Sequence, residues 1–206
     1  MQTIQTYSIE QIKLVKEALP KAMSYQEYKQ LVEQHVQDGT NSGAEVTASL
    51  ADYTMLNHRR MKRLSKTIKL QPEAILAAVG RKTPIDWLVI TESWCGDAAQ
   101  STPIMEKFAN ENPNITFKVV LRDQFPSLIE AFLTNGAQSI PKLIAYDSQN
   151  EMILGDWGPR PTMANQLVAE YKAAHGGLSP EFKQDLQIWY NKDKGHDIAN
   201  DLKNLL

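Results

Sequence analysis

The sequence predicts an α/β fold in which a mixed parallel and antiparallel sheet is flanked by helices. Residues 87–90, Trp-Leu-Val-Ile, form a short unbroken apolar run that is typical of a strand covered on both faces, and a helix is expected over residues 97–112. A second strand over residues 117–121 makes a β-α-β unit, whose strands are parallel because the helix carries the chain back. An alternating strand over residues 142–146 and a strand over residues 152–154 predict an antiparallel hairpin.

Helices are expected before this sheet. Apolar residues recur at helical spacing in two segments between Ser8 and Val36, which Pro20 separates, and each segment opens with a capping box, Ser8 with Gln11 and Ser24 with Glu27. A third helix should follow, with one face carrying Val46, Leu50, Tyr53, Asn57, Met61, Leu64 and Ile68 and an end near Leu70. A short helix should begin at Pro72 and end at Gly80.

Further helices are expected after the second strand and after the hairpin. Residues 127–135 should be helical up to Gly136, residues 162–175 up to Gly176, and Ser179 should begin a helix near the end of the chain. We therefore expect a helical N-terminal extension over residues 1–80 packed on the core, an α/β domain over residues 81–178, and a C-terminal helical segment over residues 179–206.

Composition limits the classes of partner. Of the 206 residues, 42% are hydrophobic and 22% are charged, which is typical of a globular protein, and a net charge of -2 gives no overall attraction to nucleic acid or to anionic membranes. The first residues lack the pattern of a secretory signal, and no apolar window is long enough to span a bilayer. We expect a cytoplasmic protein with neither a nucleic-acid nor a membrane partner.

Cys95 is the one cysteine of the chain, and it lies between the apolar strand and the helix that follows. A lone cysteine often serves only in packing, but the backbone N–H groups and the dipole at a helix N-terminus favour the thiolate. The carboxylate of Asp97 opposes the thiolate by about 3 kcal/mol at an effective dielectric of about 20, and by less in water. The sequence leaves the sign of the net pKa shift open.

The stretch Trp94-Cys95-Gly96-Asp97-Ala98 and the later Ser139-Ile140-Pro141 together resemble the thioredoxin superfamily, which has Trp-Cys-Gly-Pro-Cys at this strand-to-helix junction. More narrowly, residues 92–100 and 56–64 look like an uncharacterised bacterial group of thioredoxin-like proteins with an N-terminal helical extension. The resemblance implies the thioredoxin fold and a cis peptide bond before Pro141, beside Cys95.

The sequence departs from thioredoxin at two positions that matter for mechanism. Ala98 replaces the resolving cysteine, and Val89 stands where thioredoxin has its buried carboxylate. The resemblance thus implies a monothiol thiol–disulfide oxidoreductase in which Cys95 attacks a protein or small-molecule disulfide and an external thiol resolves the adduct. Two alternatives stay open: a peptide-binding or chaperone-like module with an inert Cys95, and, more weakly, a one-cysteine peroxidase, for which position 92 is Glu rather than Thr.

The same resemblance places a set of candidate substrate-binding residues around Cys95. Trp157 and Arg160 have alternative interpretations, a packing tryptophan and a solvated arginine in a proline-rich turn, and Trp94 could equally pack on a neighbouring loop. The basic stretch from His58 to Lys69 resembles the solvated face of an amphipathic helix, and the dispersed histidines favour neither a metal nor a cofactor. The candidate substrate-binding residues are Trp94, Gly96, Asp97, Ile140, Pro141, Trp157 and Arg160.

Overall fold

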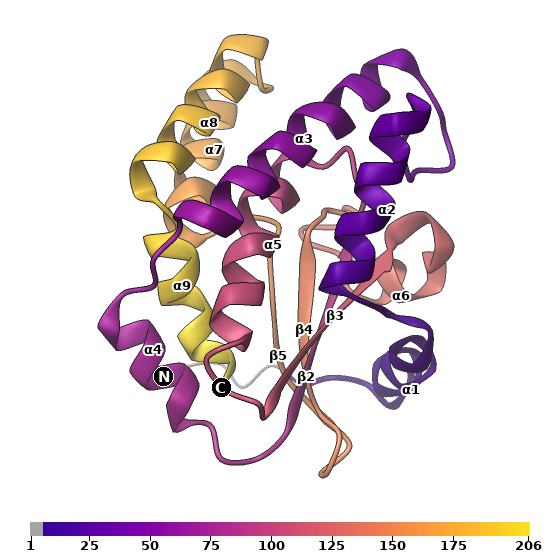
Figure 1. Ribbon diagram of the computed structural model, residues 1–206, viewed down its shortest axis with the longest axis vertical. Coiled ribbons are helices and arrows are strands. Elements are labelled where there is room, and N and C mark those ends of the chain that lie inside the picture. The colour runs from indigo at the N-terminus through magenta and orange to yellow at the C-terminus, as the bar shows by residue number, and fades with distance from the viewer. Residues whose placement is uncertain (1–5) are drawn as a thin grey trace.

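The structure, a computed structural model, describes residues 6–206 and contains a five-stranded mixed sheet with strand order β1-β3-β2-β4-β5 (Figure 1). β2 and β3 are parallel and are joined through a helix, whereas β2 with β4 and β4 with β5 are antiparallel. The predicted α/β fold class, the β-α-β unit and the hairpin are therefore confirmed. The strands are β1 Met23–Ser24, β2 Ile85–Thr91, β3 Ile115–Leu121, β4 Lys142–Asp147 and β5 Met152–Trp157.

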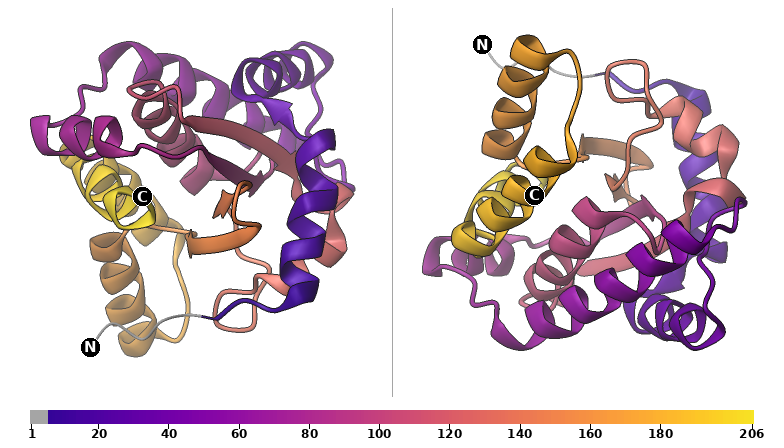
Figure 2. Two further views of the ribbon diagram at one scale, coloured as in Figure 1. Left: turned by 90° about the horizontal axis from the view of Figure 1, so that it is seen from below. Right: turned by 90° about the horizontal axis from the view of Figure 1, so that it is seen from above.

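Helices cover both faces of this sheet, and Figure 2 shows α1 and α6 on one side with α4, α5 and α9 on the other. Within residues 6–206, no helix combines the length and the apolar character that crossing a bilayer requires. The α-helices are α1 Ile9–Ala18, α2 Tyr25–Asp38, α3 Ala48–Thr67, α4 Pro72–Gly80, α5 Gly96–Ala109, α6 Pro126–Ala131, α7 Thr162–His175, α8 Pro180–Asp193 and α9 His196–Leu202.

The helix starts follow the local chemistry that the sequence indicates. Both expected capping boxes are present, at Ser8 with Gln11 and at Ser24 with Glu27, and each satisfies backbone N–H groups that the first turn of a helix leaves unpaired. The expected start of α8 is also confirmed, because the Ser179 side chain accepts a hydrogen bond from the backbone N–H of Phe182. Local capping therefore places these helix starts correctly.

Four local predictions are wrong, and β1 was not predicted. The helix after β2 ends at Ala109 rather than at residue 112, and Asn110 is its C-cap residue. The third helix ends at Thr67 rather than near Leu70, because Ile68 is already extended (ψ 135°). The helix after β3 ends at Ala131, since Asn135 (φ 52°) and Gly136 (φ 76°) form a tight turn instead. β4 does not alternate between buried and exposed residues, because both faces of this central strand are covered.

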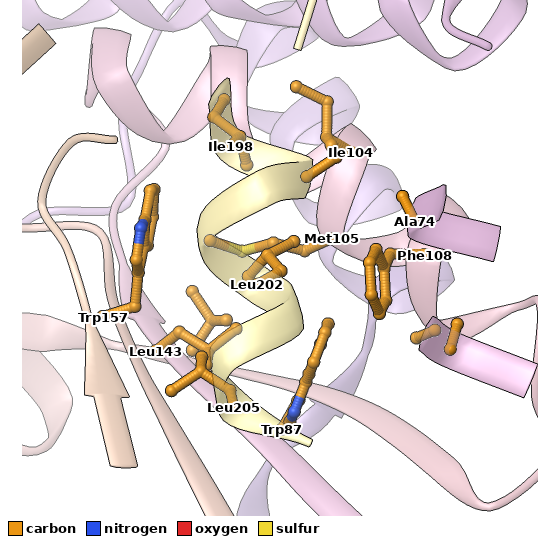
Figure 3. Packing of buried hydrophobic residues seen from close by; sticks show 14 of the residues in the cluster. Ala74, Trp87, Ile104, Met105, Phe108, Leu143, Trp157, Ile198, Leu202 and Leu205 are labelled. Carbon is orange, nitrogen blue, oxygen red and sulfur yellow. The ribbon is translucent and has the colours of Figure 1, made fainter. Parts of the chain in front are cut away.

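The two faces of β2 enter different hydrophobic clusters. Leu88 and Ile90 pack with residues of α1 and α6, while Trp87 and Val89 pack on the opposite face with residues of α4, α5 and α9. Figure 3 shows the second cluster, where Leu202 of α9 lies between the side chains of α5 and those of β4 and β5. The C-terminal helix is thus a structural part of the main core.

Truncation of Leu202 should therefore be costly. Leu202 is fully buried (0% exposed), so Leu202→Ala should lower the free energy of unfolding by about 2–5 kcal/mol in urea denaturation, since it removes buried methyl groups and leaves a cavity. Leu76→Ala is the matched control, because Leu76 is 72% exposed, and it should change stability by about 0.5 kcal/mol or less. Equal effects of the two substitutions would show that α9 does not form part of the core.

Candidate functional site

Cys95 lies at the junction where β2 ends and α5 begins. It is the N-cap residue of α5, its backbone N–H donates to the Glu92 carbonyl (3.1 Å), and its carbonyl accepts from the Ala99 N–H (3.1 Å). The side chain is 7% exposed, and its Sγ–H donates to the Ile140 carbonyl oxygen at 3.2 Å. The sulfur therefore sits directly against the residue that precedes Pro141.

Residues 92–95 are held in place by α3 and by the loop that precedes it. The Asn57 amide donates to the Ser93 carbonyl (2.9 Å), and the hydroxyl groups of Thr54 and Ser93 lie 2.9 Å apart. Ser42 and Ser93 are linked twice, because the backbone N–H of each donates to the hydroxyl of the other (3.0 and 2.8 Å). The buried Ser93 carbonyl explains why Asn57 stands in the otherwise apolar stripe of α3.

Glu92 extends this network to the end of β3. Its side chain is fully buried, accepts from the Ser42 hydroxyl, and accepts from the Asp123 N–H at 2.9 Å. Burial raises the pKa of the Glu92 carboxyl, although both hydrogen bonds act in the opposite direction. Glu92 therefore joins the loop before α3, the end of β2 and the end of β3 through a single side chain.

The environment of Cys95 favours the neutral thiol. Burial, followed by the negative charge of Asp97, raises the pKa of Cys95 to about 12, against the smaller opposing effects of the Ala98 and Asp97 backbone N–H groups and of Arg160. The sequence does not settle the direction of the pKa shift, and the structure gives a raised pKa. The cost of desolvating the thiolate outweighs the stabilisation that the N-terminus of α5 gives it.

Asp97 forms an ion pair with Arg160 above the start of α5. The Arg160 Nη2 lies 2.7 Å from Asp97 Oδ2, and the Tyr190 hydroxyl of α8 donates to Asp97 Oδ1 at 3.1 Å. Burial raises the pKa of Asp97, despite these two partners. Arg160 is therefore neither a freely solvated arginine nor a direct partner of the sulfur: it contacts the carboxylate beside the sulfur.

A close backbone approach brings Arg160 to this position. The Ile140–Pro141 and Gly158–Pro159 peptide bonds are cis, and Gly158 adopts φ 124°. A Cβ atom at residue 158 would lie 2.0 Å from the Pro141 carbonyl oxygen, so only glycine fits there. The loop after β5 can therefore lie against the start of β4, next to Cys95.

A pocket of about 690 Å³ opens over Cys95. It brings together six of the sequence-predicted residues, whereas Pro141 is buried beneath it and does not line it. The six are Trp94, Cys95, Gly96, Asp97, Ile140 and Arg160.

The two candidate tryptophans differ in their surroundings. Trp157 does not line the pocket: it belongs to the main core, as Figure 3 shows, and its indole N–H donates to Asp201 Oδ2 at 2.9 Å. Trp94 lines the pocket, with the Arg122 guanidinium 5.0 Å from its ring centroid. Trp157 therefore has the packing role that the sequence offered as its alternative.

Several residues that line the pocket are not indicated by the sequence, and most of them come from helices outside the α/β core. The sequence pattern predicts a solvated basic face for Arg60 of α3, but its side chain is partly buried and lines the pocket. Arg122, Lys183 and Gln187 line it as well, and Lys183 and Gln187 come from α8. Helical spacing indicates which residues share a face, but it does not show that α3 and α8 meet over the start of α5.

Comparisons with known proteins agree with this geometry. A thioredoxin family model matches residues 43–172, more than half of the chain. The chain belongs to this thioredoxin family. The family match begins at the loop before α3 and ends within α7, so Cys95, Pro141, Arg60 and Arg160 all fall inside it.

Solved structures show the same fold. A Pseudomonas aeruginosa protein of unknown function superposes with a TM-score of 0.56 at 18% identity, over 75% of this thioredoxin-family chain and 84% of that chain. An HIV epitope scaffold superposes with a TM-score of 0.55 at 16% identity, over 89% of this chain and 97% of that chain. The search of curated proteins found no match. At these identities the likeness concerns the fold alone.

Removing the Asp97 charge should make Cys95 more reactive. Because Asp97 raises the pKa of Cys95, Asp97→Asn should lower that pKa and accelerate alkylation by iodoacetamide about tenfold at neutral pH. The measurement is the rate of Cys95 alkylation against pH. Asp185→Asn removes the same charge from an exposed position on α8 and should leave the profile unchanged. An Asp97→Asn profile that is unchanged, or shifted to higher pH, would contradict this assignment.

Proposed function

We propose that this chain is a monothiol thiol–disulfide exchange protein in which Cys95 forms a mixed disulfide with a substrate bound in the pocket. The observation that carries the proposal is the position of the Cys95 sulfur, which lines a pocket large enough for a small molecule and lies beside the Ile140 carbonyl. The thioredoxin family places disulfide chemistry at this junction. On this proposal residues 81–178 form the domain that carries the reaction, and the flanking segments 1–80 and 179–206 supply walls of the pocket.

The first step exchanges one disulfide for another. The Cys95 sulfur attacks one sulfur of a bound disulfide R–S–S–R′, so the S–S bond of the substrate breaks while a Cys95–S–S–R bond forms. The departing R′–S⁻ takes the proton that leaves Cys95 and becomes R′–SH. No net electron transfer to another group is needed, and R′–SH is the first product.

The second step requires an external thiol, because Ala98 provides no resolving sulfur. A thiol R″–SH attacks the substrate sulfur of Cys95–S–S–R, which releases R–S–S–R″ and returns its proton to Cys95. The high pKa of Cys95 makes it a poor leaving group, so this step is slow and the adduct persists. We place the protein in the cytoplasm, where low-molecular-weight thiols are available for this step.

The second candidate function is a binding module that uses the same pocket without turnover. The specific observation in its favour is the raised pKa of Cys95, since a protonated thiol is a weak nucleophile. The two candidates differ in one property: the exchange protein forms an adduct with a small disulfide while folded, and the binding module does not.

Mass spectrometry of the intact, folded protein distinguishes these functions. Incubation with hydroxyethyl disulfide at neutral pH should give one adduct, confined to Cys95 and removed by mercaptoethanol. Cys95→Ala should give none, and Ser93→Ala should still form the adduct, because it keeps the sulfur. If the folded protein takes up no small disulfide of any charge while the urea-unfolded chain does, the exchange function is wrong, and the binding module is the candidate that stands.

A further inference from the structure

The pocket over Cys95 is rich in positive charge. Its lining carries four cationic side chains and a single acidic one, Asp97, in a chain whose net charge is -2. Arg160 pairs with Asp97 (2.7 Å) and Arg122 pairs with Asp123 (2.8 Å), so these two cations already have carboxylate partners. Arg60 and Lys183 are the other two cations of the lining. Asp97 is the one acidic residue among the lining residues.

Arg60 lies close to Gly96, the residue that follows Cys95. Its Nη1 donates to Asn57 Oδ1 at 3.1 Å, and the same Nη1 would lie 3.6 Å from a Cβ atom at Gly96, the residue after Cys95. Among the described residues, Arg60 forms no salt bridge. Burial, followed by the nearby Arg63, lowers the pKa of Arg60, and the opposing effects of Tyr53 and Asp97 are smaller.

Gln187 of α8 reaches the same point from the opposite wall. The Gln100 amide donates to Gln187 Oε1 at 2.9 Å, which fixes the orientation of the Gln187 side chain. Its other amide atom, the donor Nε2, would lie 3.8 Å from a Cβ atom at Gly96. The Arg60 guanidinium and the Gln187 N–H₂ group therefore lie close to Gly96, the first residue of α5, where the helix N-terminus also favours an anion.

The walls of the pocket limit the size of its ligand. α3 contributes Leu50, Tyr53 and Arg60 on one side, and α8 contributes Lys183 and Gln187 on the other. Figure 1 shows α3 and α8 at the same end of the molecule, beyond the N-terminal end of α5. A volume of about 690 Å³ between these two walls suits a small molecule.

We propose that Arg60, Gln187 and the first turn of α5 form an anion subsite beside Cys95, which selects low-molecular-weight disulfides and thiols that carry a carboxylate. The selection of disulfides rests on the exchange function proposed above, whereas the binding of the carboxylate does not. The ligand sulfur faces Cys95 and Ile140, and the carboxylate accepts hydrogen bonds from the Arg60 guanidinium and the Gln187 amide. Exchange with such a ligand proceeds through the same two steps as described above, with the same bonds broken and formed.

Three disulfides of similar length and different charge provide the test: dithiodipropionate is anionic, hydroxyethyl disulfide is neutral and cystamine is cationic. The rate at which each modifies Cys95 is measured by intact mass and divided by its rate with a free neutral thiol. We expect dithiodipropionate to exceed hydroxyethyl disulfide about tenfold, with cystamine slowest, because a charge-assisted hydrogen bond contributes at least that ratio. The preference should shrink with added salt.

Variants assign this preference to the subsite. Arg60→Gln should remove most of the preference for dithiodipropionate, and Gln187→Glu, which keeps the acceptor for Gln100, should slow dithiodipropionate and accelerate cystamine. Arg59→Gln is the matched control: it removes the same charge from the exposed neighbouring position of α3, outside the pocket, and should keep the preference. Thermal unfolding of each variant checks that it is folded.

The outcomes separate the subsite from the exchange function. Equal normalised rates for the three disulfides would overturn the subsite and leave the exchange function standing. If none of the three modifies Cys95, the exchange function is overturned, and calorimetry with dithiodipropionate on the Cys95→Ala protein then decides the subsite. Binding that Arg60→Gln weakens about tenfold supports it, and absent or Arg60-independent binding overturns it.

Discussion

The site depends on the hydrogen bonds that attach residues 92–95 to α3 and to the loop before it. Without them, the buried polar groups of the segment that follows β2 would lack partners. Each group left unpaired would cost about 1–3 kcal/mol of stability. Asn57, Thr54 and Ser42 supply these partners, and Glu92 adds the connection to β3. α3 therefore has two roles, because the helix that positions Cys95 also carries Arg60 into the pocket.

The electrostatics of the site follow from burial. The N-terminus of α5 contributes about 0.3–1 kcal/mol in favour of a thiolate, which is small compared with removing the sulfur from water. Asp97 adds to the effect of burial, and the Arg160 and Tyr190 contacts hold its carboxyl group beside the sulfur. On the exchange function proposed above, a thiol kept neutral in this way reacts where a bound ligand brings a disulfide into contact with it. Selectivity would then come from binding more than from an activated nucleophile.

Most of the fold was predictable from the sequence because it depends on local patterns. Three kinds of local pattern each indicate the structure of their own segment. They are the unbroken apolar run of β2, the capping serines of α1 and α2, and the glycine that ends α7. β1 was not predictable, since two residues carry no periodicity and the strand exists only through its pairing with β3. Cys95, Asp97, Ile140 and Arg160 could be placed near one another through the family resemblance, but the Arg160–Asp97 pair could not be inferred, because spacing does not give side-chain direction. Arg60 and Gln187 were missed for a related reason: their meeting point depends on how α3 and α8 pack against α5.

A crystal structure of the mixed disulfide between Cys95 and mercaptopropionate would test the exchange chemistry and the anion subsite together. We expect a disulfide bond between the Cys95 sulfur and the ligand sulfur inside the pocket, with the ligand carboxylate within hydrogen-bond distance of the Arg60 guanidinium and the Gln187 amide. An adduct whose carboxylate points into solvent or contacts other residues would contradict the account of ligand selection. A thiol that forms no adduct in the folded protein would contradict the account of exchange itself.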